Sequence, residues 1–288
     1  MRHLICAGLL AAIAGSASAA DQGYRGPITD VHAHIRYGER DGLSATHPIG
    51  PAAIVQVDDA AGVTQSALIV IARAGQLDKT RAQNDAVIAT AKASGGRFFP
   101  VASVHPADGP AALAELDRLA AAGVKVIKLH PNTQNFDVSD PAVETVVEHC
   151  AQLGLVMLFD SYKPWDSSEM GKFLLLAAKH PKAKLILAHM GFVEFRETLS
   201  FAQMRKIGIG ENVYFDLSAI AAVYAKSPVA PELVWTARQI GTDHFLFGSD
   251  WPVDTPAVAA QAVRDLGFDA AEQKQIFHDN AAALLGLK

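Results

Sequence analysis

Two histidines separated by one residue, His32 and His34, lie at the end of the first apolar segment of the chain. On an extended strand, side chains two positions apart point to the same face, so both imidazoles can reach one divalent cation. Asp30 is expected to share that face. The alternative for such a pair is two hydrogen-bonded histidines in the protein core.

Polar residues also lie at or near the ends of several later apolar segments. They are Lys128 and His130 in the fourth, Asp160 in the fifth, His189 in the sixth and Asp250 in the eighth. Imidazole and carboxylate groups are costly inside a protein unless they are paired or bind a metal. The repeated pattern therefore favours one shared site at the ends of the strands.

The elements that must position these residues alternate along the chain. Short apolar segments alternate with longer Ala-rich segments from about residue 27 onward, which is typical of a parallel sheet with crossover helices. We expect eight strands, over Ile28–His34, Ser66–Ala72, Phe98–His105, Val124–His130, Leu155–Asp160, Lys184–His189, Asn212–Leu217 and His244–Asp250. Helices are expected between them, for example over Pro110–Ala122 and Pro141–Leu153, each followed by a glycine that can end it.

One closed barrel explains this alternation better than two domains, because no Pro/Gly/Ser-rich linker interrupts the chain. An open doubly wound sheet would need a glycine-rich turn after its first strand, where this chain has Asp30-Val31-His32-Ala33-His34. The sequence therefore predicts an α/β fold, a single (β/α)8 TIM barrel over residues 21–288, with its active site at the C-terminal ends of the strands. In such a barrel the first and last strands are neighbours, so His32, His34 and Asp250 converge.

The N-terminal residues have the features of an export signal. Arg2 precedes an apolar run from Leu4 to Ile13, and small residues with an A-x-A cleavage pattern follow. We expect residues 1–20 to be a cleaved signal peptide, and the mature protein to be periplasmic or secreted and free of the membrane. Cys150 is then the one cysteine left, and we expect it to be a buried hydrophobic residue.

The charge pattern excludes nucleic acid as the expected partner. The formal net charge is -5, from 25 Lys and Arg against 30 Asp and Glu, and the basic residues are scattered singly. Proteins that bind nucleic acid gather such residues into a patch or stripe. The expected partner is a small-molecule substrate, and the sequence is compatible with a homo-oligomer.

The ordered set of motifs resembles the amidohydrolase-related (amidohydrolase 2) family. The motifs are Ile28-Thr29-Asp30-Val31-His32-Ala33-His34, Lys128-Leu129-His130-Pro131, His189-Met190-Gly191, Phe247-Gly248-Ser249-Asp250-Trp251-Pro252, and the closing Asn280-Ala281 with Leu284-Leu285. This resemblance runs from about residue 27 to the end. It implies a metal at the barrel mouth, with His32, His34 and Asp250 as ligands and His189 as a catalytic or ligating residue.

One residue departs from the family pattern. Relatives commonly end the fifth strand with a metal-binding histidine, whereas this chain has Asp160. A carboxylate can replace an imidazole on zinc, and its negative charge favours a harder ion such as manganese. We expect one divalent metal ion, zinc or alternatively manganese, held by His32, His34, Asp160 and Asp250. The alternative is a metal-free lactonase in which Asp250 acts alone as the base.

Basic side chains near the strand ends are candidates for substrate binding. Lys128 is expected to contact an anionic substrate, and its alternatives are a carbamylated bridge between two metals and a structural ion pair. Arg73 and Arg196, after the second and sixth strands, can clamp a carboxylate or can be solvated surface charges. His130 precedes Pro131 and can lie near the substrate on a mouth loop.

The expected reaction is hydrolysis of a small lactone, ester or amide. Metal-activated water would attack, Asp250 would act as general base, and His189 would stabilise the oxyanion. The alternative is non-oxidative decarboxylation of a small aromatic or unsaturated carboxylic acid, which the family resemblance also covers. A third hypothesis is an inactive barrel that acts as a binding protein. Product analysis distinguishes the three hypotheses. Carbon dioxide release indicates a decarboxylase, acid release without carbon dioxide indicates a hydrolase, and the absence of both favours a binding protein.

Overall fold

The computed structural model describes residues 23–37 and 49–287, which contain every strand that the sequence predicts. The predicted signal peptide over residues 1–20 lies outside the described residues, so export stays a prediction. Within the described ranges, no helix combines the length and apolar character needed to cross a membrane.

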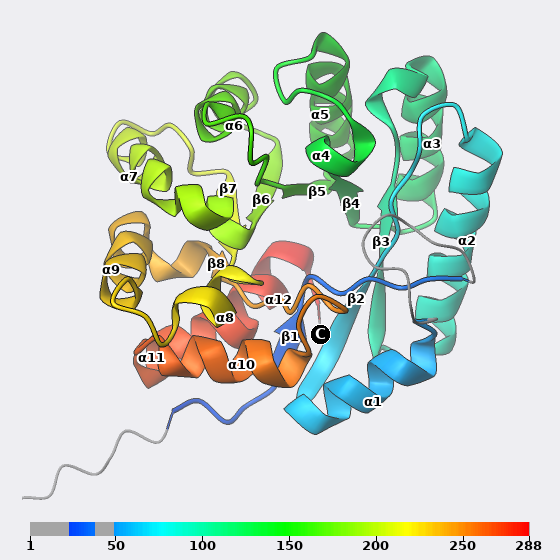
Figure 1. The fold of residues 1–288 in the computed structure, drawn as a ribbon. Coiled ribbons are helices and arrows are strands. Elements are labelled where there is room, and N and C mark those ends of the chain that lie inside the picture. Colours follow the sequence, from blue (N-terminus) through cyan, green and yellow to red (C-terminus); the bar gives the residue numbers. More distant parts are fainter. Residues whose placement is uncertain (1–22, 38–48, 288) are drawn as a thin grey trace, which may run out of the picture.

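Eight parallel strands form one sheet in chain order (Figure 1). They are β1 (Ile28–Asp30), β2 (Val63–Ile69), β3 (Phe98–Ser103), β4 (Val126–Leu129), β5 (Val156–Asp160), β6 (Lys184–Ala188), β7 (Val213–Asp216) and β8 (Phe245–Leu246). Backbone hydrogen bonds close the sheet: the amide of Val31 donates to the carbonyl of Phe247 at 3.0 Å, and that of Asp250 to the carbonyl of His32 at 2.7 Å. The predicted barrel is confirmed, and its first and last strands are neighbours.

Most strands end earlier than the apolar segments that predicted them. His32 and His34 follow β1 instead of lying in it, because the chain bends at Val31. Asp250 likewise lies four residues beyond the end of β8 at Leu246. His32, His34 and Asp250 therefore lie on loops at the barrel mouth, where their side chains need not follow the alternation of a strand.

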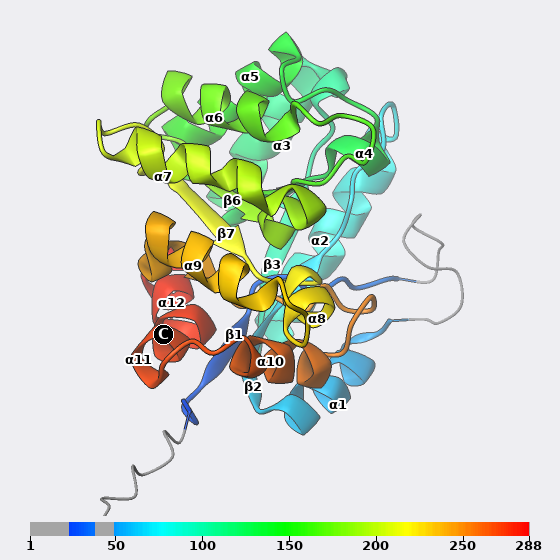
Figure 2. The same ribbon diagram turned by 60° about the vertical axis from the view of Figure 1, so that its left-hand side comes forward.

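Helices surround the strands on the outside (Figures 1 and 2). The longer ones are α1 (Pro51–Ala61), α2 (Leu77–Ala93), α3 (Pro110–Ala121), α5 (Pro141–Leu153), α6 (Glu169–Lys179), α9 (Ala230–Ile240) and α10 (Pro256–Asp265). The shorter ones are α4 (Pro131–Gln134), α7 (Leu199–Arg205), α8 (Ile220–Tyr224), α11 (Ala270–Lys274) and α12 (Asn280–Leu285). Helices α3 and α5 match the two predicted ones, and each begins with a proline, whose fixed φ suits the first helical position.

An apolar layer fills the barrel below the mouth. One buried cluster combines residues of six strands (Ala67, Ile69, Val101, Val126, Val156, Leu158, Ile186, Ala188 and Leu246) with Val31 and with Ala281, Leu284 and Leu285 of α12. Only the barrel interior can bring residues of these six strands together. Cys150 is fully buried against the helices, as predicted. Because apolar side chains occupy the interior, the polar residues after the strands form the next layer toward the mouth.

A buried carboxylate in α1 makes the stability of the protein depend on pH. Asp58 is fully buried, and the guanidinium of Arg97 lies 4.0 Å from its carboxylate. Burial, together with the charge of Asp30, raises the pKa of Asp58 to about 8. The folded protein therefore keeps a proton that the unfolded chain releases above about pH 4. The free energy of unfolding falls as pH rises between these two pKa values.

Asp58→Asn is therefore expected to stabilise the protein at about pH 8, by about 2 kcal/mol or more, and to change its stability little at about pH 4.5. Urea denaturation at both pH values measures this difference. Asp59→Asn, which removes an exposed neighbouring carboxylate, is the control and should keep the pH dependence of the wild type. Equal pH dependence of the wild type and Asp58→Asn would show that the buried carboxyl is not protonated in the folded protein.

Candidate active site

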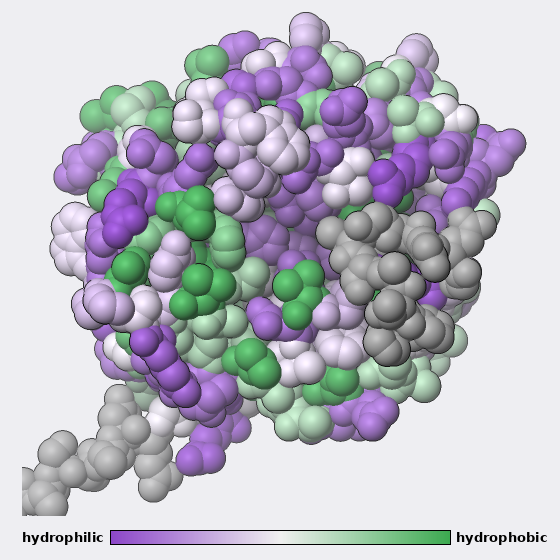
Figure 3. Space-filling view, in the orientation of Figure 1, coloured by the Kyte–Doolittle hydropathy of each residue, from purple (hydrophilic) through white to green (hydrophobic). Residues whose placement is uncertain are grey.

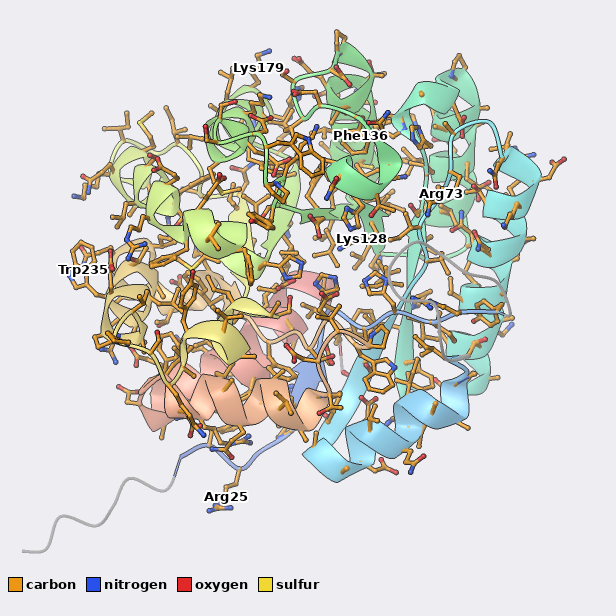
Figure 4. All side chains as sticks on the ribbon, viewed as in Figure 1. Arg25, Arg73, Lys128, Phe136, Lys179 and Trp235 are labelled. Atoms are coloured by element: carbon orange, nitrogen blue, oxygen red, sulfur yellow. The ribbon has the colours of Figure 1, made fainter. Side chains whose placement is uncertain are left out.

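The polar residues at or just after the strand ends meet at the mouth of the barrel. They are His32 and His34 after β1, Lys128 in β4, His130 after β4, Asp160 in β5, His189 after β6, Asp216 in β7 and Asp250 after β8, and all are buried. Figure 4 places Lys128 in the middle of the ring of helices. Figure 3 shows hydrophilic residues in the recessed centre of the same face. These residue types bind cations and transfer protons.

Asp250 joins the two histidines that follow β1. Its Oδ1 lies 3.3 Å from Nε2 of His32 and 3.4 Å from Nε2 of His34. Burial by itself would raise the pKa of Asp250, but the charges of His32, His189 and His34 hold that pKa well below its usual range. The prediction that these side chains converge across the β1–β8 junction is confirmed.

Asp160 makes a second set of contacts in the cluster. Its Oδ2 lies 3.3 Å from Nε2 of His189 and 3.4 Å from Nε2 of His130. Burial disfavours a charged imidazole, but the carboxylates of Asp160 and Asp250 outweigh burial at His189 and raise its pKa to about 9. At His130 burial prevails and lowers the pKa to about 4. His189 thus holds a proton at neutral pH that His130 does not.

Lys128 is a fully buried lysine within the cluster. Its Nζ lies 3.0 Å from Nε2 of His32. Burial lowers the pKa of Lys128, and the carboxylates of Asp160, Asp250 and Asp216 counteract part of that effect. The ammonium therefore balances the charge of the surrounding acids. Its nearest described partner is His32, and a contact with substrate stays a prediction.

Sequence patterns did not point to two further residues of the site, Asp216 and Ser218. Oδ2 of Asp216 lies 3.0 Å from Nδ1 of His32, and its Oδ1 accepts from the amides of His189 and Ser218, each at 3.0 Å. Ser218 Oγ lies 2.9 Å from Nδ1 of His189. A signal was present, since Asp216 lies near the end of the seventh apolar segment much as Asp160 ends the fifth.

Asp30 does not share the face of the two histidines but holds the backbone of the site through hydrogen bonds to main-chain amides. Its Oδ1 accepts from the amide of His32 at 2.9 Å and from the amide of Ser249 at 3.0 Å. These bonds tie the loop after β1 to the loop after β8. The bend at Val31 explains the difference, because it breaks the strand alternation on which the prediction relied.

Three side chains are arranged to hold a metal ion. One ligand atom each from His32, His189 and Asp250 lies within 4.8 Å of the other two, and this is the only such group in residues 23–37 and 49–287. Two imidazole nitrogens and one carboxylate oxygen suit zinc and manganese alike. The predicted ligands His34 and Asp160 lie beside this group: His34 contacts Asp250, and Asp160 contacts His189.

The two arginines that were expected to clamp a carboxylate have protein partners. Arg196 is half exposed and binds Glu232 through Nε at 2.6 Å and Nη2 at 2.5 Å. Arg73 donates to the carbonyl of Thr133 at 3.0 Å, in the helix that begins after His130. Figure 4 shows Arg73 farther from the centre of the barrel than Lys128.

The backbone is strained where the site is built. In the described part of the chain, the non-glycine residues with positive φ lie in the segments after β4, β6, β7 and β8: Asn135, His189, Met190, Phe192, Ala219 and Asp250. Such conformations cost on the order of 1–3 kcal/mol each and persist where the surrounding structure holds them, commonly at functional sites. Two of these residues, His189 and Asp250, belong to the group that is arranged to hold a metal.

Comparisons with known proteins give one family match and several solved structures of the same fold. The sequence model of a family described as amidohydrolase matches residues 29–287. A 2,6-dihydroxybenzoate decarboxylase from Rhizobium is similar with a TM-score of 0.71 at 16% identity, over 91% of this chain and 99% of that one. A 5-carboxyvanillate decarboxylase from Sphingomonas paucimobilis is similar with a TM-score of 0.68 at 16% identity, over 91% and 99% of the two chains.

A third similar structure contains a metal. It is a dihydroxybenzoic acid decarboxylase from Polaromonas with bound manganese and the inhibitor 2-nitroresorcinol, with a TM-score of 0.72 at 18% identity, over 91% of this chain and 98% of that one. At such identities the likeness establishes the fold alone. Among functionally curated proteins, none matches the chain.

Proposed function

Because the chain belongs to the amidohydrolase family, we propose that it is a metal-dependent lyase that removes carbon dioxide from a small carboxylic acid without oxidation. The observation that carries this proposal is the buried ammonium of Lys128 beside His32, a member of the group that would hold the metal. Solved decarboxylases of the same fold support it, and one of them binds manganese. Hydrolysis of a lactone, ester or amide is the less supported reaction.

His32, His189 and Asp250 would hold the metal ion. When bound, a divalent ion supplies positive charge that polarises substrate oxygens and stabilises the negative charge that develops during the reaction. The protein supplies the orientation of these three side chains through Asp216, Ser218 and the strained loops. It also excludes water from their far sides, because all three are buried.

Nε2 of His32 has one lone pair and can serve either Lys128 or a metal ion. In the structure the ammonium of Lys128 donates to this nitrogen. When His32 is a metal ligand, Lys128 needs another acceptor, because a buried ammonium without one is costly. A substrate carboxylate is such an acceptor. This reasoning supports the expectation that Lys128 contacts an anionic substrate.

The reaction needs one proton at carbon: R–COO⁻ and H⁺ give R–H and CO₂. The bond between the carboxylate carbon and its neighbour breaks, its electron pair stays on the neighbouring carbon, and that carbon takes the proton. An ammonium that faces the carboxylate also lies next to the carbon that must be protonated. Nζ of Lys128 can release this proton because burial lowers the pKa of the side chain.

The proposal is tested by incubating the zinc- or manganese-loaded protein with hydroxylated benzoic acids and unsaturated dicarboxylic acids. We expect carbon dioxide to be released in equal amount to the acid consumed, and chelation of the metal to lower the rate by at least about 100-fold. Parallel assays use aryl lactones, esters and amides. Acid release from these without carbon dioxide would replace the proposal with hydrolysis. Inertness of the metal-loaded protein toward both classes would favour a binding protein.

A further inference from the structure

We propose that Asp216 and Ser218 act as one positioning unit that fixes which nitrogen of His32 and of His189 carries a proton, and thereby sets the metal affinity of the site. This inference rests on the proposed metal-dependent function. Asp216 ends β7, and Ser218 lies two residues later. Both side chains are fully buried, so they act through the two histidines and not on the substrate.

The hydroxyl group of Ser218 has one proton to donate, and its contacts determine which partner receives that hydrogen bond. Oγ makes a very short contact with Oδ1 of Asp216, and an ionised carboxylate can only accept, so the hydroxyl donates there. The same Oγ lies 2.9 Å from Nδ1 of His189 and 3.2 Å from Nδ1 of His32. Ser218 Oγ can therefore only accept hydrogen bonds from the two imidazoles.

The other hydrogen-bond partners of the two Nδ1 atoms are acceptors as well. Nδ1 of His32 lies 3.0 Å from Oδ2 of Asp216, and Nδ1 of His189 lies 3.1 Å from the carbonyl oxygen of Ser218. A ring nitrogen that faces acceptors must carry the proton. In the neutral imidazole the lone pair is then on Nε2. Nε2 of His189 faces the carboxylate of Asp160 at 3.3 Å and holds a second proton, which it would release when a metal binds. With that proton gone, the Nε2 lone pairs of both histidines would be available to one cation, together with Asp250.

The surrounding backbone locks this unit in place. Oδ1 of Asp216 accepts from the amides of His189 and Ser218, which fixes the start of the loop after β6 relative to the end of β7. A Cβ at Gly248 would lie 2.8 Å from Cβ of His32 and 3.3 Å from Cβ of Ser218. Glycine in the segment after β8 thus lets the backbone approach the unit closely. Partners that orient metal-binding histidines in this way typically contribute about 10- to 100-fold to metal affinity.

Two variants test the inference, Asp216→Asn and Ser218→Ala. Zinc affinity is measured by competition with a chromophoric chelator, and the ring-nitrogen protonation of ¹⁵N-labelled histidines is measured by NMR in the zinc-loaded proteins. We expect Asp216→Asn to weaken zinc binding by about 10- to 100-fold and Ser218→Ala by a smaller factor. In the wild type, His32 and His189 should both show a proton on Nδ1, and in Asp216→Asn this signature of His32 should change. Asp58→Asn, which also replaces a fully buried carboxyl group, is the matched control and should change neither readout.

These readouts do not depend on turnover, so they separate the inference from the proposed function. The inference would be overturned by an Asp216→Asn protein that is folded, as judged by urea denaturation, and has two further properties. It would bind zinc within about twofold of the wild type, and it would keep the proton of His32 on Nδ1. A proton on Nε2 of either histidine in the zinc-loaded wild type would overturn it as well. If the wild type releases no carbon dioxide yet both expected effects appear, the inference stands and the proposed reaction fails.

Discussion

Replacing His32 by alanine or Asp250 by asparagine is expected to remove the metal from the purified protein. Each change deletes one member of the group whose ligand atoms lie within 4.8 Å of one another. The loss of affinity should exceed about 100-fold, since indirect partners of metal ligands already contribute up to that factor. Turnover should fall with the metal content, because the remaining side chains cannot supply the charge of a divalent ion.

Elemental analysis by plasma mass spectrometry, on proteins prepared under the same conditions, measures this effect. We expect about one equivalent of zinc or manganese in the wild type and almost none in the two variants. His149→Ala is the matched control, because that imidazole pairs with Asp117 away from the site. Full metal content in both variants would place the ion elsewhere. A wild type that stays without metal after reconstitution would leave a metal-free lactonase or a binding protein.

The same measurement decides between the two ligand sets. The sequence prediction names His32, His34, Asp160 and Asp250 as ligands, with His189 as a catalytic or ligating residue, whereas the structure groups His189 with His32 and Asp250. Asp160→Asn should keep most of its metal if the structural group is correct. A loss as complete as that of Asp250→Asn would instead restore Asp160 as a ligand.

Most of the fold could be predicted because its signals are local in the sequence. Each strand is a short apolar segment, and each is separated from the next by enough residues for a crossover helix. Closure of the barrel followed from the number of these units, and closure is what brings Asp250 to His32. The family match then confirms that the chain is an enzyme of the amidohydrolase superfamily.

The parts of the site that could not be predicted depend on distant contacts. Asp216 is one carboxylate inside an apolar segment, and its role comes from His32, 184 residues away in the sequence. Arg196 was a candidate for substrate binding because no sequence pattern reveals its partner Glu232, 36 residues later on α9. The position of Asp30 also depended on a bend at Val31 that strand periodicity does not foresee.

Lys128→Met is expected to lower the rate of carbon dioxide release by about 1000-fold and to leave the metal bound. Methionine has a similar length and fills the buried space, but it has no proton and no charge. The loss corresponds to removal of a general acid, which typically contributes about 100- to 10,000-fold. Metal affinity should increase, because Nε2 of His32 loses the ammonium that occupies it and a neighbouring positive charge disappears.

Steady-state kinetics with parallel metal analysis tests this expectation. Lys163→Met is the matched control: this lysine lies in the loop after β5 and donates from Nζ to the carbonyl of Phe136 at 3.2 Å, so the variant should keep wild-type turnover. If Lys128 served only as a structural ion pair, its removal would destabilise the protein and lower metal content and turnover together. Loss of metal from a folded Lys128→Met protein would favour the remaining alternative, a lysine that bridges metal ions.

We expect the Lys128→Met protein to retain its metal and to lose turnover. This result would separate the three roles because Lys128 and the metal would use the same lone pair of His32. Nε2 of His32 serves the ammonium in the structure and would serve the ion in the active protein. Lys128 is fully buried near the carboxylates of Asp160, Asp250 and Asp216, so its ammonium cannot turn to solvent when the metal takes the lone pair of His32. In the proposed reaction, the proton that His32 no longer accepts would be available to the carboxylate of the substrate. The same contact that balances charge without substrate would thus supply the proton for the reaction.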